Sequence, residues 1–122
     1  MNSYRDLLVW QRGMDLVDLV YRVSGALPRE HAYGLAKQLQ KSAVSIPSNI
    51  AEGHARDSTR EYLRFISIAL GSIAELETQV LICQRQQLLV DADVASVMQL
   101  ADEIGKMLRG VQQRLRTKLA SP

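Results

Sequence analysis

Apolar residues recur at steps of three and four along most of the chain, a spacing that places them on one face of an α-helix. The breaks in this pattern predict four helices, at about residues 4–27, 30–53, 58–87 and 91–118. Pro28 forces the chain out of the first helix, and Gly53 is expected to end the second as a left-handed C-cap. Ser58 with Glu61 matches a capping box at the third helix, and Asp91 is expected to cap the fourth.

Helices of similar length joined by short links favour an antiparallel bundle in which the chain runs up, down, up and down. We therefore predict an all-α, single-domain four-helix bundle covering residues 1–122. Pro47 lies inside the second helix, where it removes an amide donor and crowds the carbonyl four residues earlier, so a kink or local unwinding is expected. Ser45, Ser48 and Asn49 are placed to satisfy the freed backbone groups.

The composition is that of an ordinary globular protein, with 47% hydrophobic and 23% charged residues. Cys83 is the only cysteine, which excludes an intramolecular disulfide and a four-cysteine metal site, and its apolar neighbours favour a place in the core. The N-terminus has no signal-peptide pattern, and no segment is expected to approach the roughly 20 apolar residues of a membrane helix. We expect a cytoplasmic protein with no membrane partner.

The one marked charge cluster lies near the end of the fourth helix and has no acidic residue within it. It consists of Lys106, Arg109, Arg114, Arg116 and Lys118. The helix macrodipole favours cations at a C-terminus and accounts for two or three of them as part of a solvated helix end. The surplus predicts a modest patch for nucleic-acid phosphates, which repetition in an oligomer would strengthen. Without an aromatic stacking platform, sequence-specific recognition is not expected.

A polar stripe follows the second helix at steps of four and three, formed by Gln38, Ser42, Ser45, Asn49 and Glu52. One interpretation is a binding surface shared with Glu75 and Gln79 of the third helix. The other is a set of hydrogen bonds that fixes helix register and satisfies the proline.

Gly71 and Ser72 lie in the middle of the third helix, where a glycine lowers helix stability by roughly 1 kcal/mol relative to alanine. We expect a close helix contact there, within the bundle or between subunits, in preference to a ligand.

Catalytic chemistry has little support in the sequence. Di-metal bundles use a Glu-x-x-His pair on each of two helices, and this chain has no such pair. A metal or hydrolytic site at Glu52, Glu75 and Glu77 is the strongest enzymatic alternative, and no nucleophile lies in an activating motif. We predict no catalytic residues, no metal and no cofactor.

Residues 42–53 read Ser-Ala-Val-Ser-Ile-Pro-Ser-Asn-Ile-Ala-Glu-Gly, a proline within a helix followed by an Asn-Ile-Ala-Glu-Gly stop. This segment resembles the S23 family, four-helix-bundle proteins encoded within intervening sequences of bacterial 23S ribosomal RNA genes. The resemblance extends to Leu-Val-Trp-Gln at 8–11, Tyr-Gly-Leu at 33–35, Ala-Leu-Gly-Ser at 69–72 and Glu-Leu-Glu-Thr-Gln at 75–79. The motif positions we expect to be structural are Ser45, Pro47, Asn49, Glu52, Gly53, Gly71, Ser72 and Glu75.

The resemblance implies a four-helix bundle that assembles into a ring of five. It also implies a relation to the accessory proteins of diversity-generating retroelements, which look like nucleic-acid-binding partners of a reverse transcriptase. Most of the family has no established biochemical activity. The resulting hypothesis is a non-enzymatic oligomeric scaffold, a pentamer, that contacts the backbone of RNA or DNA through its fourth helix. The alternative is a structural module that binds an unidentified protein.

Overall fold

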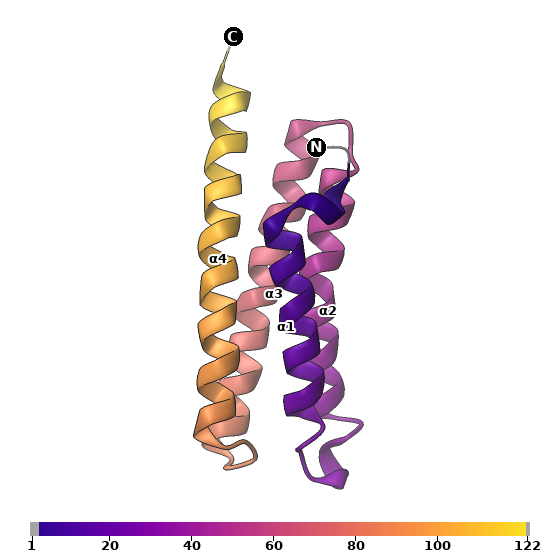
Figure 1. Ribbon diagram of the computed structural model, residues 1–122, viewed down its shortest axis with the longest axis vertical. Coiled ribbons are helices and arrows are strands. Elements are labelled where there is room, and N and C mark those ends of the chain that lie inside the picture. Colours follow the sequence, from indigo (N-terminus) through magenta and orange to yellow (C-terminus); the bar gives the residue numbers. More distant parts are fainter. Residues whose placement is uncertain (1–2, 122) are drawn as a thin grey trace.

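The protein is all-α, as the hydrophobic periodicity predicts. The computed structural model describes residues 3–121, and within them it contains four long helices, two short 3-10 turns and no strand. The elements are η1 (Tyr4–Asp6), α1 (Leu8–Ser24), η2 (Arg29–His31), α2 (Leu35–His54), α3 (Thr59–Arg85) and α4 (Asp91–Ala120). Figure 1 shows α1 joined to α2 at one end of the molecule, α2 to α3 at the other end, and α3 to α4 at the first end.

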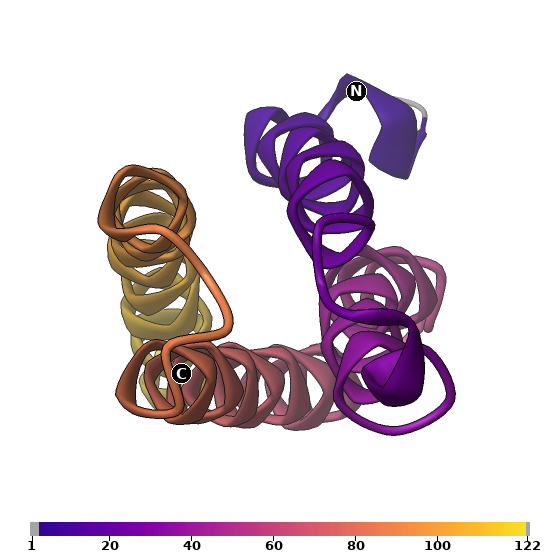
Figure 2. The same ribbon diagram turned by 90° about the horizontal axis from the view of Figure 1, so that it is seen from below.

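The helices lie side by side in chain order around the bundle (Figure 2). The interface between α2 and α3 is the most extensive, whereas α1 and α4 contact each other least among the four neighbouring pairs. One fully buried side chain from each helix illustrates the shared core: Leu16, Ile46, Leu76 and Ile104. Cys83 is also buried in this core, and the burial raises the pKa of its thiol.

The α-helices begin later than predicted in the first half of the chain. The predicted helix at 4–27 is an α-helix only from Leu8 to Ser24, because η1 comes first and Leu7 is extended (φ −74°, ψ 124°). The predicted helix at 30–53 begins at Leu35, after η2 and a non-helical Gly34 (φ −102°, ψ −101°). Three residues are too few to show a helical period, so the sequence pattern cannot distinguish these turns from α-helix.

Two of the three predicted caps are wrong. Gly53 is helical, α2 continues to His54, and no glycine among residues 3–121 has a positive φ. Asp91 is the first residue of α4 and makes no capping bond, because the N-cap position belongs to Val90. Ser58 does cap α3, since its Oγ accepts a hydrogen bond from the Glu61 amide at 3.1 Å.

Pro47 does not unwind α2, so of the two outcomes expected from sequence, a kink or local unwinding, the unwinding is absent. The α-helix continues on both sides of the proline, whose ring is buried against α1. A Cβ built on Gly13 would lie 3.3 Å from the Pro47 Cβ, so the glycine allows the two helices to approach. Within α2 itself, Asn49 donates a hydrogen bond from Nδ2 to the Ser45 carbonyl at 2.7 Å.

α3 is more apolar than the sequence analysis assumed. By length and composition alone it is long and apolar enough to cross a membrane, with a mean hydropathy of 1.5 over its most apolar 18-residue window. The core helix of a soluble protein passes the same test, and Ile66, Ile73 and Val80 of α3 are buried against the other helices. The apolar character of α3 is therefore accounted for in part by the bundle core.

Candidate functional site

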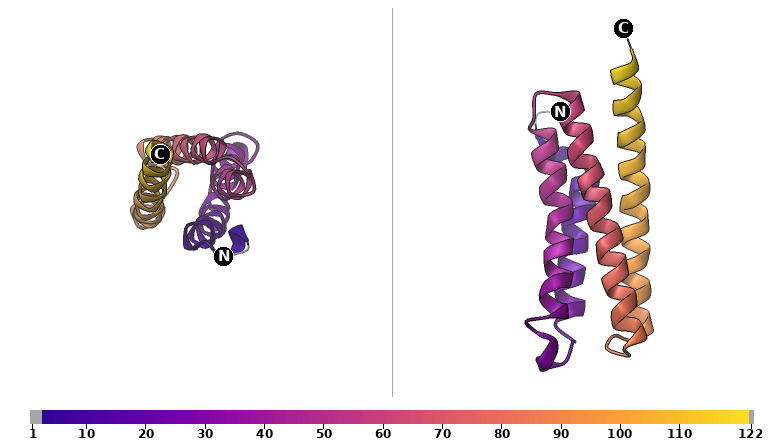
Figure 3. Two further views of the ribbon diagram at one scale, coloured as in Figure 1. Left: turned by 90° about the horizontal axis from the view of Figure 1, so that it is seen from above. Right: turned by 180° about the vertical axis from the view of Figure 1, so that it is seen from behind.

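The C-terminal half of α4 carries the cations selected from the sequence, and the end of this helix extends beyond the ends of the other helices (Figures 1 and 3). We call Lys106, Arg109, Arg114, Arg116 and Lys118 the basic segment. All five side chains are exposed. Lys106 pairs with Asp102 at 3.2 Å, and the other four make no ion pair with any residue between 3 and 121. Four positive charges are therefore available to an external anion.

The basic segment surrounds the helix instead of forming one flat patch. At 3.6 residues per turn, Arg114 and Lys118 lie on one side of α4, while Arg109 and Arg116 lie on another. The apolar stripe between the two sides includes Leu108, which is fully buried, and Leu115, which packs partly against the core. Cations thus flank the apolar face on both sides.

Two glycines lie beneath the arginines. A Cβ built on Gly105 would lie 3.5 Å from Nη1 of Arg109, and one on Gly110 would lie 3.5 Å from Nη1 of Arg114. Each guanidinium therefore lies back along the helix over the glycine four residues earlier. Burial raises the pKa of the Tyr62 phenol on α3, and the positive charge of Arg114 opposes that rise.

A further exposed cation, Arg60, was missed by the sequence analysis. It lies in the first turn of α3, at the end of the bundle where α4 also ends (Figure 1), and it makes no ion pair with the described residues. Its neighbours Arg56 and Arg64 are less available: Arg56 pairs with Glu52 at 3.2 Å, and Arg64 with Glu61 at 3.1 Å. Only the directions of the helices place Arg60 near the basic segment, so no local motif could have identified it.

The polar stripe on α2 forms hydrogen bonds to α3. Asn49 donates from Nδ2 to Ser45 Oγ at 2.9 Å, and Ser45 Oγ lies 2.8 Å from Ser72 Oγ. Ser72 Oγ in turn donates to the Ile68 carbonyl at 3.2 Å, so Ser45 is the donor to Ser72. These groups form one continuous chain of bonds that links the two helices.

Ser42 extends these α2–α3 contacts to the predicted residues of the third helix. Its Oγ lies 3.1 Å from Oε1 of Glu75 and 2.9 Å from Oε1 of Gln79. Gln38 and Glu52 are exposed, and only the first of them lines the open cavity of about 440 Å³ above Ser42. Within residues 3–121 every buried side-chain nitrogen and oxygen has a partner. The stripe therefore contains both the register-fixing bonds and a polar hollow beside them.

The two motif glycines have different surroundings. A Cβ on Gly53 would lie 2.7 Å from the Phe65 Cβ, so this glycine brings α2 against α3. Gly71 has nothing within 4 Å of a built Cβ, so the expected close contact within the bundle is absent there. Gly13 was not predicted to matter, because its contact with Pro47 has no signature in the hydrophobic pattern.

The carboxylates that the enzymatic alternative used are not assembled into a site. Glu52 binds Arg56, and Glu75 accepts a hydrogen bond from Ser42. In the part of the chain that the structure describes, no three acidic, histidine or cysteine side chains come together as metal ligands.

Comparison with known proteins identifies the fold and the family. No curated protein matches the chain. A solved structure that does match is the 1.70 Å crystal structure of a protein of unknown function from the S23 ribosomal protein family of Bacteroides thetaiotaomicron. It superposes with a TM-score of 0.80 at 22% sequence identity, over 86% of this chain and 98% of that chain, and at this identity it shows the fold.

The family described as 23S rRNA-intervening sequence protein matches residues 5–110. The match includes the whole polar stripe and both motif glycines, and it ends before Arg114, Arg116 and Lys118. Because it covers most of the chain, the protein belongs to the family of 23S rRNA-intervening sequence proteins.

Proposed function

We propose that this protein is a non-enzymatic, homo-oligomeric helical scaffold that binds the phosphate backbone of nucleic acid through the basic segment of α4. The observation that carries the proposal is the basic segment itself. Four of its five cations are exposed without an ion pair among the described residues, on a helix that projects beyond the bundle. No aspartate or glutamate lies between Ile104 and Pro122, so no acidic side chain is interleaved with these cations.

Phosphate binding of this kind is electrostatic and independent of sequence. Each phosphate neutralised by a lysine or arginine releases condensed counterions, so affinity rises with the number of contacts and falls steeply with salt. A single helix end supplies few contacts. Repetition of the segment in an assembly multiplies them, because linked sites bind with a high effective concentration.

The outward face of α3 supports the assembly. Ile68, Leu81 and Ile82 are large apolar residues that are 39%, 42% and 42% exposed. Gly71 lies on the same helix with open space around it, and a small residue allows another helix to approach closely. We propose that this face packs against a second copy of the chain, in the ring of five that the family resemblance implies.

The first experiment measures binding and assembly together. Fluorescence anisotropy of labelled single-stranded RNA and of duplex DNA is titrated at two salt concentrations, with the protein mass checked by light scattering. The test variant carries Arg114→Gln, Arg116→Gln and Lys118→Gln. A matched control carries Arg22→Gln, Lys37→Gln and Lys41→Gln, three exposed cations on α1 and α2.

We expect the test variant to lose most of the affinity, with the slope of log affinity against log salt reduced by about 2 to 3, since each lost phosphate contact removes about 0.7 to 0.9. The control should retain the wild-type slope. Equal losses in both variants would show that net charge and not the basic segment drives binding. A mass of five times the 13.7 kDa chain is expected, and a monomer would overturn the assembly.

A protein-interaction role is the second candidate, and the exposed apolar side chains of α1 favour it. Leu8 is 61% exposed and Met14 40% exposed, and both are large apolar side chains that a partner protein would cover. An oligomer that binds neither RNA nor DNA at low salt would make this the better function.

A further inference from the structure

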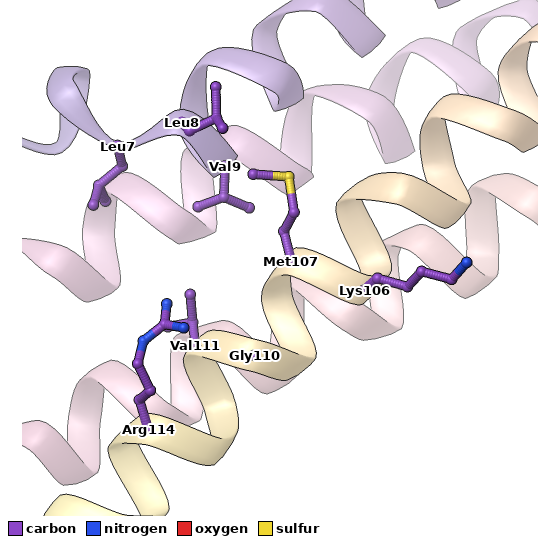
Figure 4. A pocket seen from close by; sticks show the side chains of 8 residues that line it. All are labelled: Leu7, Leu8, Val9, Lys106, Met107, Gly110, Val111 and Arg114. Atoms are coloured by element: carbon purple, nitrogen blue, oxygen red, sulfur yellow. The ribbon is translucent and has the colours of Figure 1, made fainter.

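A cavity of about 500 Å³ lies between the start of α1 and the C-terminal half of α4, and Figure 4 shows its lining. Most of the lining is apolar: Leu7 and Val9 come from the α1 side, and Met107 and Val111 from α4. The Met107 side chain reaches toward Val9 across the cavity (Figure 4). This volume falls within the range of roughly 300 to 1,000 Å³ typical of small-molecule sites.

The backbone and one glycine create the space. The extended Leu7 separates η1 from α1, so that the chain turns before the helix starts and Leu7 and Val9 both line the cavity. On α4, Gly110 leaves the cavity wall without a side chain, and a Cβ there would meet only Nη1 of Arg114 at 3.5 Å. Leu8 lines the same cavity and is 61% exposed. The site therefore presents apolar surface to the solvent.

The charge at the cavity is entirely positive. Lys106 and Arg114 are its two charged lining residues, and no acidic residue lines it. Lys106 extends away from the other lining side chains (Figure 4), and its Nζ pairs with Asp102 at 3.2 Å. Arg114 lies beside Val111 (Figure 4) and makes no ion pair with residues 3–121, so its guanidinium is available to an anion.

We propose that this cavity binds a small anionic amphiphile, an acyl chain whose carboxylate lies on Arg114. The chain fills the apolar space between α1 and α4, and the guanidinium holds the carboxylate through two parallel hydrogen bonds, the geometry for which arginine is suited. A neutral chain would leave the guanidinium without its anion, and a cationic one would be repelled by it. The site does not depend on the proposed nucleic-acid function.

The test uses the apolar anionic dye 1-anilinonaphthalene-8-sulfonate as a fluorescent probe and decanoate, decan-1-ol and decyltrimethylammonium as competitors. Gly110→Leu fills the cavity and keeps every charge. Its matched control is Ala95→Leu, which adds a similar side chain at an exposed position of the same helix. Arg114→Gln removes the charge, with Arg116→Gln as its control, and circular dichroism checks that each variant is folded.

We expect decanoate to displace the probe and the other two competitors to do so weakly. Gly110→Leu should weaken probe binding at least about tenfold because the cavity is filled, and Arg114→Gln should weaken decanoate about tenfold, the scale of one hydrogen-bonded charge. Both control variants should bind as the wild type does. Undiminished binding by Gly110→Leu would overturn the site. Equal displacement by decanoate and decan-1-ol would overturn the role of Arg114.

Discussion

At the scale of single residues, Gly53 marks a close approach of α2 and α3. A Cβ at this position would lie 2.7 Å from the Phe65 Cβ and 3.3 Å from the Tyr62 carbonyl oxygen. We expect Gly53→Ala to lower the free energy of unfolding by about 1 to 3 kcal/mol, since overpacking outweighs the gain of about 1 kcal/mol in helix propensity. Urea denaturation followed by circular dichroism measures the change.

The matched control is Gly110→Ala, also in a helix, where a Cβ meets only the mobile end of Arg114 at 3.5 Å. Here the propensity gain should dominate and raise stability by about 0.5 to 1 kcal/mol. If both alanine variants gained stability, the close approach at Gly53 would be refuted.

Gln87 is the one residue between 3 and 121 with a left-handed backbone, at φ 60°. It follows the end of α3, where the Leu88 amide donates to the Cys83 carbonyl at 2.9 Å, the bond of a Schellman motif. A glycine avoids the Cβ strain of this conformation, so Gln87→Gly should raise the free energy of unfolding by about 1 kcal/mol. Thermal denaturation tests this, and Gln86→Gly, at φ −85°, should give no gain.

The sequence identified Gly53 as important but assigned it the wrong physical role. A glycine near a helix end suits either a left-handed cap or a close approach of another helix, and only the neighbouring helix decides between them. Gly13 illustrates the same limit, because its partner Pro47 is distant in sequence. The position of a glycine is visible in the sequence, whereas its partner is not.

At the scale of elements, side-chain hydrogen bonds join α2 and α3 across the most extensive interface of the bundle. Ser45 and Ser72 lie 2.8 Å apart at their hydroxyl oxygens. Replacing either with alanine should cost about 1 kcal/mol, and the double variant should cost less than the sum, with a coupling of about 0.5 to 1 kcal/mol. Denaturation of the wild type, the two single variants and the double variant measures the coupling.

The control is Ser96→Ala. The Ser96 hydroxyl forms its hydrogen bond within α4, so its loss should change the free energy of unfolding by less than about 0.5 kcal/mol. Strict additivity would contradict the bridge.

Periodicity predicted the polar stripe and all four helices, and it placed the ends of α3 and α4 to within two residues, but it placed the starts of α1 and α2 too early. The chain makes 3-10 turns at Tyr4–Asp6 and Arg29–His31, each too short to show a period of its own. Torsions at Leu7 and Gly34 then separate these turns from α1 and α2. Such local geometry depends on tertiary contacts, so a pattern read along one chain does not contain it.

At the scale of the whole molecule, the fold followed from the sequence, while the arrangement of charge did not. The basic segment was visible as a run of cations, but the extension of its end beyond the bundle depends on the length of α4, which has 30 residues against 17 in α1. Arg60 joins that end of the molecule only because of the direction of α3. The structure was therefore needed to show which residues distant in sequence lie at the same end of the molecule.

The α1–α4 interface, with the fewest contacts, has the one ion pair between helices among residues 3–121. Arg12 donates to Glu103 from Nε at 3.3 Å and from Nη2 at 2.9 Å, and also binds Asp15 at 2.8 Å. The guanidinium holds the pKa of Glu103 below its usual range, and this lowered pKa sets the pH dependence. The ion pair therefore stabilises the folded protein fully above the pKa of a glutamate in the unfolded chain, about 4.3. This stabilisation is lost as the pH falls through the lower pKa of Glu103 in the folded protein.

The pair predicts a pH-dependent difference between the wild type and Glu103→Gln. At neutral pH and low salt the wild type should have the higher thermal midpoint, and the difference should close as pH falls below about 4, because protonated Glu103 no longer attracts Arg12. Added salt should also reduce this difference in thermal midpoint, since the pair is exposed.

The control is Asp18→Asn, which alters an exposed carboxylate without an ion pair among the described residues. Its difference in midpoint from the wild type should not close in this way as the pH falls. Protein concentration is held constant, because assembly shifts the midpoint by mass action. A midpoint difference independent of pH would mean that Glu103 contributes by packing alone and that α1 and α4 are held together by their apolar contacts.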